Sequence, residues 1–254
     1  MAVVLAACGG STTGPAAGTT PTAATPSPTP VVRITFHLAG DSTMGEPIPE
    51  RDPETGWGEN LQDLFDPGRL QVVNYSKRGR STRTFLSEGY WSALLPNVRA
   101  GDWVIVQFGH NDGSIDEEQT PPSEYRANFT RFVADIRARG GLPLLATPIV
   151  VRRFDSRGAL QDTHGQYPDI VRSVAQSTGT PLLDMQQISA RLVTEYGVEG
   201  SRELYQHLAP GQHPNYPGGL ADNIHLSPTG ARLLAQRAAQ TMKAMNLPLA
   251  AFLL

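Results

Sequence analysis

The chain has 254 residues, 39% of them hydrophobic, and a formal net charge of −3 at pH 7. This size and composition predict one soluble globular domain with a substantial buried core. The nearly even charge balance argues against nucleic acid or an anionic membrane as the main partner, and no apolar run approaches the length of about 18 residues that a transmembrane helix needs.

The first 30 residues contain no Asp, Glu, Lys or Arg, and residues 9–30 consist only of Gly, Ser, Thr, Pro and Ala. A segment of this kind has nothing to bury, so residues 9–30 are predicted to form a disordered tether. Ahead of the tether, residues 1–8 end in Leu5-Ala6-Ala7-Cys8. Together with Gly9, this stretch resembles the box of bacterial lipoproteins, in which the cysteine receives the lipid.

The apolar run before Cys8 is shorter than a normal signal core, and no basic residue precedes it, so residues 1–8 are interpreted as a truncated signal segment. A shortened ordinary signal peptide and an isolated buried cysteine are the alternatives. Cys8 is the only cysteine, so it belongs to no internal disulfide framework, which favours lipid attachment. We expect an exported protein, either a lipoprotein of the bacterial cell envelope, periplasmic or at the cell surface, or a secreted one.

Residues 31–254 are predicted to form a single domain. The predicted strands are apolar on successive residues, as is typical of parallel strands covered on both faces. They are Arg33–Ala39, Leu70–Tyr75, Trp103–Phe108, Leu142–Pro148 and Pro181–Met185. Helical patterns lie between and after them, at Gly58–Phe65, Thr82–Leu95, Ser123–Arg139, Tyr167–Ser177, Gln186–Tyr196 and Ser227–Met245. The alternation predicts a doubly wound α/β domain with a parallel sheet of about five strands.

The first predicted strand ends in Gly40-Asp41-Ser42-Thr43. Ligands of open parallel sheets bind at the carboxyl ends of the strands, so the Ser42 hydroxyl is expected at the functional edge. The tripeptide alone is a weak signal, because Gly, Asp and Ser are also ordinary turn residues. The interpretation of Ser42 as a nucleophile therefore depends on what other segments bring to the same edge.

Three further segments are predicted at that edge, containing Gly79, Asn111 and the pair Asp222 and His225. A serine hydroxyl needs a base to remove its proton, and the base needs a third group to orient it. In a turn entering the last helix, Asp222 would hold the Nδ1–H of His225 while Nε2 faces Ser42. The Gly79 N–H, the Asn111 amide and the Ser42 N–H would then bind the oxyanion. Taken singly, these segments also fit plain turns or a helix cap.

With these segments the chain resembles the SGNH (GDSL-type) hydrolase superfamily, whose four blocks match Ser42, Gly79, Asn111 and the Asp222/His225 pair. Within it, Gly40–Met44, Gly79–Phe85, Phe108–Gly113, Thr147-Pro148 with Arg152-Arg153, and His213–Pro217 resemble the rhamnogalacturonan acetylesterase group. The resemblance spans roughly residues 33–245. It implies a three-layer α/β/α sandwich of flavodoxin-like topology and the removal of acetyl groups from plant cell-wall polysaccharides, with no metal or other cofactor. Ile224 departs from the small polar residue expected there, which puts hydrogen bonding around the pair in question.

We therefore expect a serine esterase that deacetylates a polysaccharide or oligosaccharide of the rhamnogalacturonan (pectin) or xylan type. It is expected to act as a monomer and to touch a membrane only through a lipid anchor. Basic residues on loops at the same edge are candidates to bind substrate carboxylates, unless they pair with acids of their own loops or face solvent. Among them are Lys77, Arg78, Arg80, Arg83, Arg152 and Arg153.

Two alternatives remain open at this point. One is a GDSL-type lipase or thioesterase for longer acyl chains, which would need an apolar groove beside Ser42. The other is a catalytically idle, lipid-anchored carbohydrate-binding protein. The Gly-x-Ser-x-Gly motif of α/β-hydrolases and the ligand spacing of zinc esterases do not occur in the sequence.

Overall fold

A computed structural model describes residues 1–4, 9–10 and 33–254. Cys8 and all of the predicted tether except Gly9 and Gly10 lie outside the described residues. The truncated signal segment, the tether and the lipid attachment therefore stay predictions.

The fold is built on a parallel sheet with the strand order β2-β1-β3-β4-β5. Its strands are β1 (Ile34–Gly40), β2 (Leu70–Asn74), β3 (Trp103–Gln107), β4 (Leu142–Ala146) and β5 (Leu182–Leu183). Each lies close to its predicted position, and the predicted five-stranded parallel sheet is confirmed. In this flavodoxin-like order, β2 is added on one side of β1, and β3, β4 and β5 are added on the other side. Ligands of such sheets bind where the order changes, at the carboxyl ends of β1 and β3.

The helices of the described residues are α1 (Thr82–Ser87), α2 (Tyr90–Leu94), α3 (Pro122–Ala138), α4 (Tyr167–Thr178), α5 (Met185–Gly200) and α6 (Pro228–Ala244). Short 3-10 segments are η1 (Pro49–Arg51), η2 (Trp57–Asn60), η3 (Gln62–Leu64), η4 (Leu95–Asn97), η5 (Ser201–Leu204) and η6 (Pro248–Phe252). None of these helices combines the length and the apolar character that crossing a membrane requires.

Two helix predictions are wrong in detail. The pattern over Thr82–Leu95 predicts one helix, but Glu88 and Gly89 separate α1 from α2, with Gly89 at φ +85°. The pattern over Gly58–Phe65 also predicts an α-helix, whereas the chain forms η2 and η3 there. Its backbone bonds span three residues, from the Leu61 N–H to the Gly58 carbonyl (3.1 Å) and from the Leu64 N–H to the Leu61 carbonyl (3.0 Å), as in 3-10 helices.

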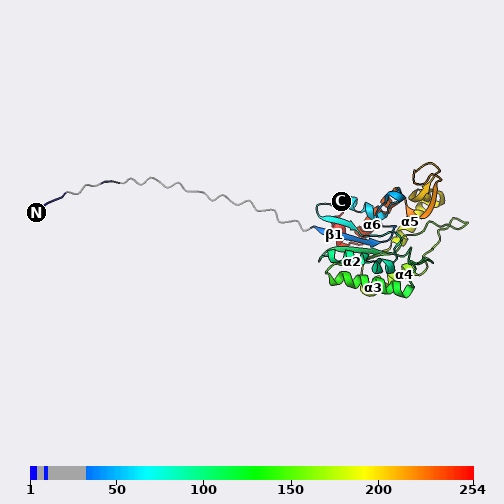
Figure 1. The fold of residues 1–254 in the computed structure, drawn as a ribbon, viewed down its shortest axis with the longest axis horizontal. Coiled ribbons are helices and arrows are strands. Elements are labelled where there is room, and N and C mark those ends of the chain that lie inside the picture. The colour runs from blue at the N-terminus through cyan, green and yellow to red at the C-terminus, as the bar shows by residue number, and fades with distance from the viewer. Residues whose placement is uncertain (5–8, 11–32) are drawn as a thin grey trace. The chain divides into compact units, whose positions relative to one another are not determined.

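Both faces of the sheet are covered, which confirms the three-layer sandwich. On β3, Trp103 and Ile105 enter one core, while Val104 and Val106 enter the other. Because such a strand has no solvent-facing side, its sequence is apolar on successive residues. Helices α1 to α4 cover the face of Val104 and Val106, and α5 and α6 cover the opposite face (Figure 1).

A second sheet of two antiparallel strands, β6 (Tyr205–Leu208) and β7 (Leu220–Leu226), has no counterpart among the sequence predictions. The predicted turn at Asp222 and His225 is wrong, because both residues lie on β7, and α6 begins only after its N-cap Ser227. The strand escaped prediction because its side chains are mostly polar or partly exposed. Only Leu226 is buried, so no apolar alternation marks it.

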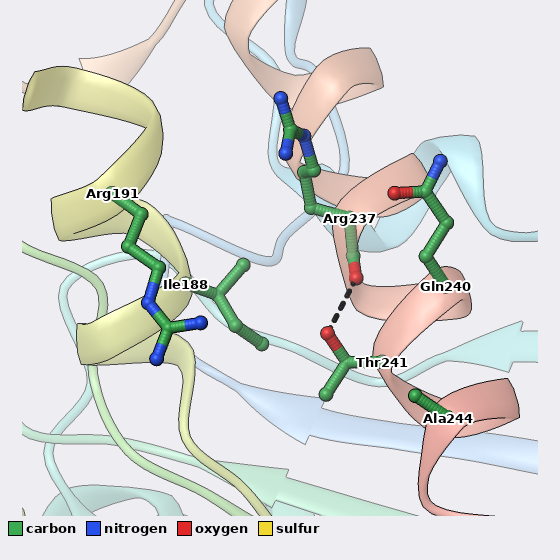
Figure 2. A pocket seen from close by; sticks show the side chains of 6 residues that line it. All are labelled: Ile188, Arg191, Arg237, Gln240, Thr241 and Ala244. Atoms are coloured by element: carbon green, nitrogen blue, oxygen red, sulfur yellow. Dashed lines mark hydrogen bonds between the residues drawn. The ribbon is translucent and has the colours of Figure 1, made fainter. Parts of the chain in front are cut away.

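A cavity of about 330 Å³ lies between α5 and α6 (Figure 2). It is lined by Ile188, Arg191, Arg237, Gln240, Thr241 and Ala244. Arg237 is paired with Glu195 (2.8 Å), and Thr241 donates to the Arg237 carbonyl (2.8 Å). None of the site residues predicted from the sequence lines this cavity, so the candidate site lies elsewhere.

Candidate active site

Ser42 lies in the turn directly after β1, and its neighbours hold that turn in place. The buried Asp41 carboxylate accepts hydrogen bonds at Oδ1 from the Thr43 N–H (2.9 Å) and the Thr43 hydroxyl (2.7 Å). Gln107, at the end of β3, donates to Thr43 Oγ1 (2.7 Å) and accepts a bond from Trp57 Nε1 (2.9 Å). These bonds fix the backbone around Ser42, and the Ser42 hydroxyl takes no part in them.

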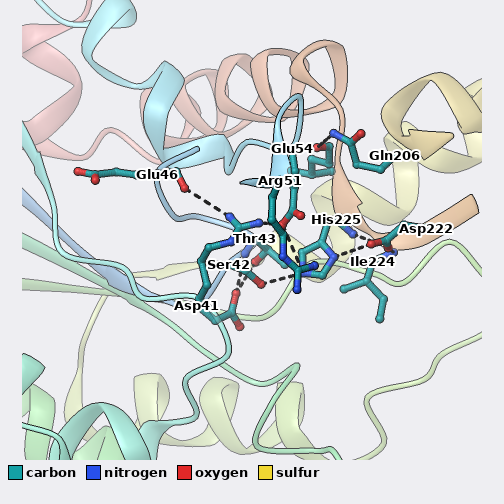
Figure 3. A network of polar contacts seen from close by, with 12 residues as sticks. Asp41, Ser42, Thr43, Glu46, Arg51, Glu54, Gln206, Asp222, Ile224 and His225 are labelled. Atoms are coloured by element: carbon teal, nitrogen blue, oxygen red, sulfur yellow. Dashed lines mark hydrogen bonds and ion pairs between the residues drawn. The ribbon is translucent and has the colours of Figure 1, made fainter. Parts of the chain in front are cut away.

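The Ser42 hydroxyl instead contacts His225. Ser42 Oγ is 3.0 Å from His225 Nε2, and His225 Nδ1 is 2.7 Å from Asp222 Oδ2 (Figure 3). An imidazole that donates its Nδ1–H to a carboxylate keeps Nε2 unprotonated, so Nε2 can accept the Ser42 proton. The structure thus brings Ser42, His225 and Asp222 together in an order that allows a proton to leave the serine.

An irregularity in β7 places the side chains of Asp222 and His225 on the same side of the strand. The register of the β6–β7 ladder shifts between Tyr205 and His207, so the opposing stretch of β7 bulges. Within the bulge, Asp222 Oδ1 accepts hydrogen bonds from the N–H groups of Ile224 (2.7 Å) and His225 (3.0 Å). Side chains three residues apart on a regular strand point to opposite faces, and this bulge brings them together.

Asp222 is held in its ionised form. Burial alone would raise the pKa of its carboxyl group, but the hydrogen bond and charge of His225 and the two backbone N–H groups lower that pKa to about 2. The carboxylate therefore keeps its charge throughout the neutral and mildly acidic range. It can hold the Nδ1–H of His225 wherever the imidazole itself is neutral.

Gly79 and Asn111 follow β2 and β3, the strands on either side of β1. The loop after β2 reaches the end of β1, where the Lys77 N–H donates to the Gly40 carbonyl (2.9 Å). It also meets the loop after β3, because Asn111 Nδ2 donates to the Arg80 carbonyl (3.1 Å). Gly79 has φ +68°, a conformation that favours glycine. Both predicted oxyanion donors thus lie on loops that are joined to each other beside the Ser42 turn.

Glu54 belongs to the same cluster, although the sequence did not single it out. It is 2% exposed, and its Oε1 is 3.5 Å from His225 Nε2. The same carboxylate oxygen forms an ion pair with Arg78. The sequence signal is the Gly-Trp-Gly that follows Glu54 and Thr55. A Cβ atom on Gly56 would collide with the Met44 backbone, so this segment packs directly against the Ser42 turn.

Two of the arginines predicted as possible substrate-binding residues are engaged by the chain itself. Arg80 Nε donates to the Glu88 carboxylate (2.6 Å), and Arg83 Nε donates to the Gln119 carbonyl (3.2 Å). Both arginines are partly exposed, so each would have to exchange a partner within the chain for a substrate group. Arg80 thus pairs with an acid close to it in the chain, whereas Arg83 bonds a backbone carbonyl of the loop that follows β3.

Arg152 and Arg153, two further candidates, differ from each other. Arg152 is buried; its Nε donates to Ser201 (2.9 Å) and its Nη1 donates to Asn223 Oδ1 (3.0 Å). Asn223 lies between Asp222 and Ile224 on β7, so the hydrogen bond from Arg152 stabilises the bulge. This role in the fold argues against contact between Arg152 and a substrate. The exposed Ile224 supplies no side-chain hydrogen bond there, and Arg152 and Asn223 provide this support instead. Arg153 is exposed and remains a candidate.

A family model described as the GDSL-like Lipase/Acylhydrolase family matches residues 38–233. The chain is 37% identical over 216 residues to rhamnogalacturonan acetylesterase RhgT of Bacillus subtilis, covering 85% of this chain and 92% of that protein. It is 30% identical over 220 residues to the probable rhamnogalacturonan acetylesterase YesY of the same organism, covering 84% of this chain and 94% of that protein.

Solved structures share the fold. The crystal structure of YxiM from Bacillus subtilis matches with a TM-score of 0.74 and 25% identity, covering 86% of this chain and 58% of that chain. The acetylxylan esterase Axe2 of Geobacillus stearothermophilus matches with a TM-score of 0.58 and 17% identity, covering 87% of this chain and 98% of that chain. At that identity, the second match is evidence for the fold alone.

Proposed function

Because the chain belongs to the GDSL-like lipase/acylhydrolase family and is a carboxylic ester hydrolase, we propose that it removes O-acetyl groups from a cell-wall polysaccharide. The observation that carries the proposal is the continuous relay from Ser42 Oγ through His225 to Asp222, with contacts of 3.0 and 2.7 Å. A relay of this geometry turns a serine hydroxyl into a nucleophile.

In the proposed mechanism, Ser42 Oγ attacks the acetyl carbonyl while His225 Nε2 takes its proton. The imidazolium, stabilised by the Asp222 carboxylate, then gives that proton to the departing sugar hydroxyl, which leaves an acetyl group on Ser42. A water molecule, deprotonated by His225, releases acetate and restores the serine. The N–H groups of Ser42 and Gly79 and the Asn111 amide stabilise the negatively charged oxygen of both tetrahedral intermediates.

The surroundings of Ser42 favour a small acyl group on a polar molecule over a long acyl chain. The charged residues Glu54, Arg78 and Asp222 lie around the His225 ring, and Asn111 lies on the adjoining loop. A lipase or thioesterase would instead bury a hydrocarbon chain beside its nucleophile, which requires apolar lining. The named functions of RhgT and YesY also support an acetylated pectin-type polymer as the substrate.

The substrate class is tested by measuring released acetate from acetylated rhamnogalacturonan, acetylated homogalacturonan and acetylated xylan at matched acetyl content. We expect the highest kcat/KM on rhamnogalacturonan. A parallel series of nitrophenyl esters should show activity falling steeply from acetate to butyrate and octanoate, because the charged residues around His225 disfavour the burial of a longer hydrocarbon chain.

Two results would contradict the proposal. Higher kcat/KM on octanoate than on acetate would identify a lipase or thioesterase. Tight binding of the polysaccharides without any release of acetate would identify a carbohydrate-binding protein that has lost its catalytic activity.

A further inference from the structure

Glu54 places a second carboxylate against the catalytic imidazole. Asp222 lies at His225 Nδ1, whereas Glu54 Oε1 lies 3.5 Å from Nε2, the nitrogen that also contacts Ser42. Figure 3 shows Glu54 and Asp222 approaching the ring from different sides. A serine–histidine–aspartate relay needs only the Nδ1 carboxylate, so the mechanism leaves Glu54 without a role.

The backbone holds Glu54 in this position. Its N–H donates to the Arg51 carbonyl (2.9 Å), and the following Thr55 N–H donates to the Leu226 carbonyl (3.4 Å), directly after His225. The Gly56 N–H donates to the Gly45 carbonyl (2.9 Å), in the turn that carries Ser42. The segment around Glu54 is therefore bonded to both elements that supply the relay, and Glu54 moves with them.

Arg78 compensates the charge of Glu54. Its guanidinium forms an ion pair with Glu54 Oε1, and its Nη1 donates to the Glu46 carbonyl (3.3 Å). Arg78 comes from the loop after β2, directly before Gly79, so the same loop supplies the compensating cation and a proposed oxyanion donor. The Arg78 guanidinium is only partly exposed, and this burial lowers its pKa.

The position of this pair has a consequence for proton transfer. An uncompensated carboxylate beside Nε2 would attract the Nε2–H of the imidazolium and stabilise it, which would delay transfer of the proton to the leaving hydroxyl. With the Arg78 cation on the same oxygen, the carboxylate contacts the ring edge while its charge is largely cancelled. The Glu54–Arg78 pair therefore lies against Nε2 without a net charge that would keep the proton there.

We propose that Glu54 and Arg78 form a charge-compensated pair beside His225, in which the Arg78 cation cancels the attraction of the Glu54 carboxylate for the proton on Nε2. This inference rests on the proposed function, since it assigns the pair to the same relay. Both residues act on the reaction through His225, because Glu54 contacts its Nε2 and Arg78 contacts Glu54.

Other charged or titratable groups also lie around His225 and the Glu54–Arg78 pair. Asp222 lies on the same strand as His225, Asp41 lies beside Ser42, His110 lies on the loop after β3, and Arg51 lies beside Arg78. Burial, together with the charge of His225, lowers the pKa of His110 to about 3, so this ring stays neutral where an esterase is assayed. All four groups remain in the variants proposed below, so a change in pH dependence reports the Glu54–Arg78 pair.

The test compares pH profiles of kcat/KM on an aryl acetate for Glu54→Gln, Arg78→Gln and the double variant. Removing the carboxylate disfavours the imidazolium, so the acid limb should move to lower pH in Glu54→Gln, by about one pH unit. Removing the cation has the opposite effect, so the limb should move to higher pH in Arg78→Gln. The double variant, which lacks both charges, should return close to the wild-type limb.

The matched controls are Glu195→Gln and Arg237→Gln, which break a surface ion pair (2.8 Å) outside the site and should leave the limb unmoved. Limbs that move in the same direction, or that do not move in folded variants, would overturn the proposal. If Arg78→Gln does not fold, NMR titration of the His225 ring in wild type and Glu54→Gln decides the same question. Failure of the wild type to hydrolyse any ester would refute the proposed function instead.

Discussion

Replacing Ser42 with alanine is expected to lower kcat on an aryl acetate by about 10⁵- to 10⁶-fold, with KM little changed. The hydroxyl is the only group of the site that can form the acetyl intermediate in the proposed mechanism. Among the described residues, its one hydrogen bond is with His225 Nε2 (3.0 Å), so the variant should fold normally. Steady-state kinetics and circular dichroism of the purified variant check the two statements.

The exposed residue Ser92 on α2 provides the matched control. Ser92→Ala removes the same hydroxyl from the surface and should keep wild-type kcat. A folded Ser42→Ala protein with more than a tenth of the wild-type kcat would be incompatible with Ser42 as the nucleophile.

The Asp222→Asn variant is expected to lose about 10⁴-fold in kcat while retaining its fold. The carboxylate oxygen Oδ1 accepts hydrogen bonds from the N–H groups of Ile224 and His225, and an asparagine would keep those bonds with its own Oδ1. Its Nδ2 then faces the ring at the position of Oδ2. Because this nitrogen only donates, it favours the tautomer with the proton on Nε2, which cannot accept the Ser42 proton.

Asp155→Asn is the matched control for that substitution. Asp155 Oδ1 accepts hydrogen bonds from the N–H groups of Arg157 (2.8 Å) and Ala159 (2.9 Å) in a loop turn, so its substitution also preserves backbone contacts. Asp155→Asn should retain wild-type kcat. Equal losses of kcat in the two variants would mean that Asp222→Asn acts by destabilising the protein and not by changing the tautomer of His225.

The central sheet could be predicted from the sequence because its strands are covered on both faces. Residues such as Val104 and Ile105 are buried on opposite sides, and this produces an apolar run that local pattern analysis detects. The strand ends then indicate where Ser42, Gly79 and Asn111 lie, since parallel strands deliver their following loops to one edge. The fold class and the neighbourhood of these three residues follow from that reasoning.

The local geometry of the base could not be predicted in the same way. Asp222 and His225 share a side because β7 bulges against β6, and a bulge depends on a partner strand distant in sequence. The same holds for Glu54, whose contact with His225 depends on Gly56 packing under the Ser42 turn. Local pattern cannot reveal contacts that depend on tertiary packing.

The arginines illustrate a further limit of sequence reasoning. The sequence predicted that they lie on loops at the carboxyl edge of the sheet, but it could not predict which groups they bind. Arg152 donates hydrogen bonds to Ser201 and Asn223, whereas Arg78 forms an ion pair with Glu54. Whether an arginine binds substrate or a neighbouring residue depends on acids and carbonyls supplied by other loops, which a single sequence does not place.

In the proposed mechanism, catalysis proceeds through a covalent intermediate in which the acetyl group is bound to Ser42. The most direct measurement is to quench wild-type enzyme with acid during turnover of an aryl acetate, digest it, and locate the acetyl group by mass spectrometry. We expect acetylation of the peptide that contains Ser42, on the serine itself, and none in Ser42→Ala. An acetyl group on any other residue of the turning-over enzyme, with Ser42 unmodified, would contradict it.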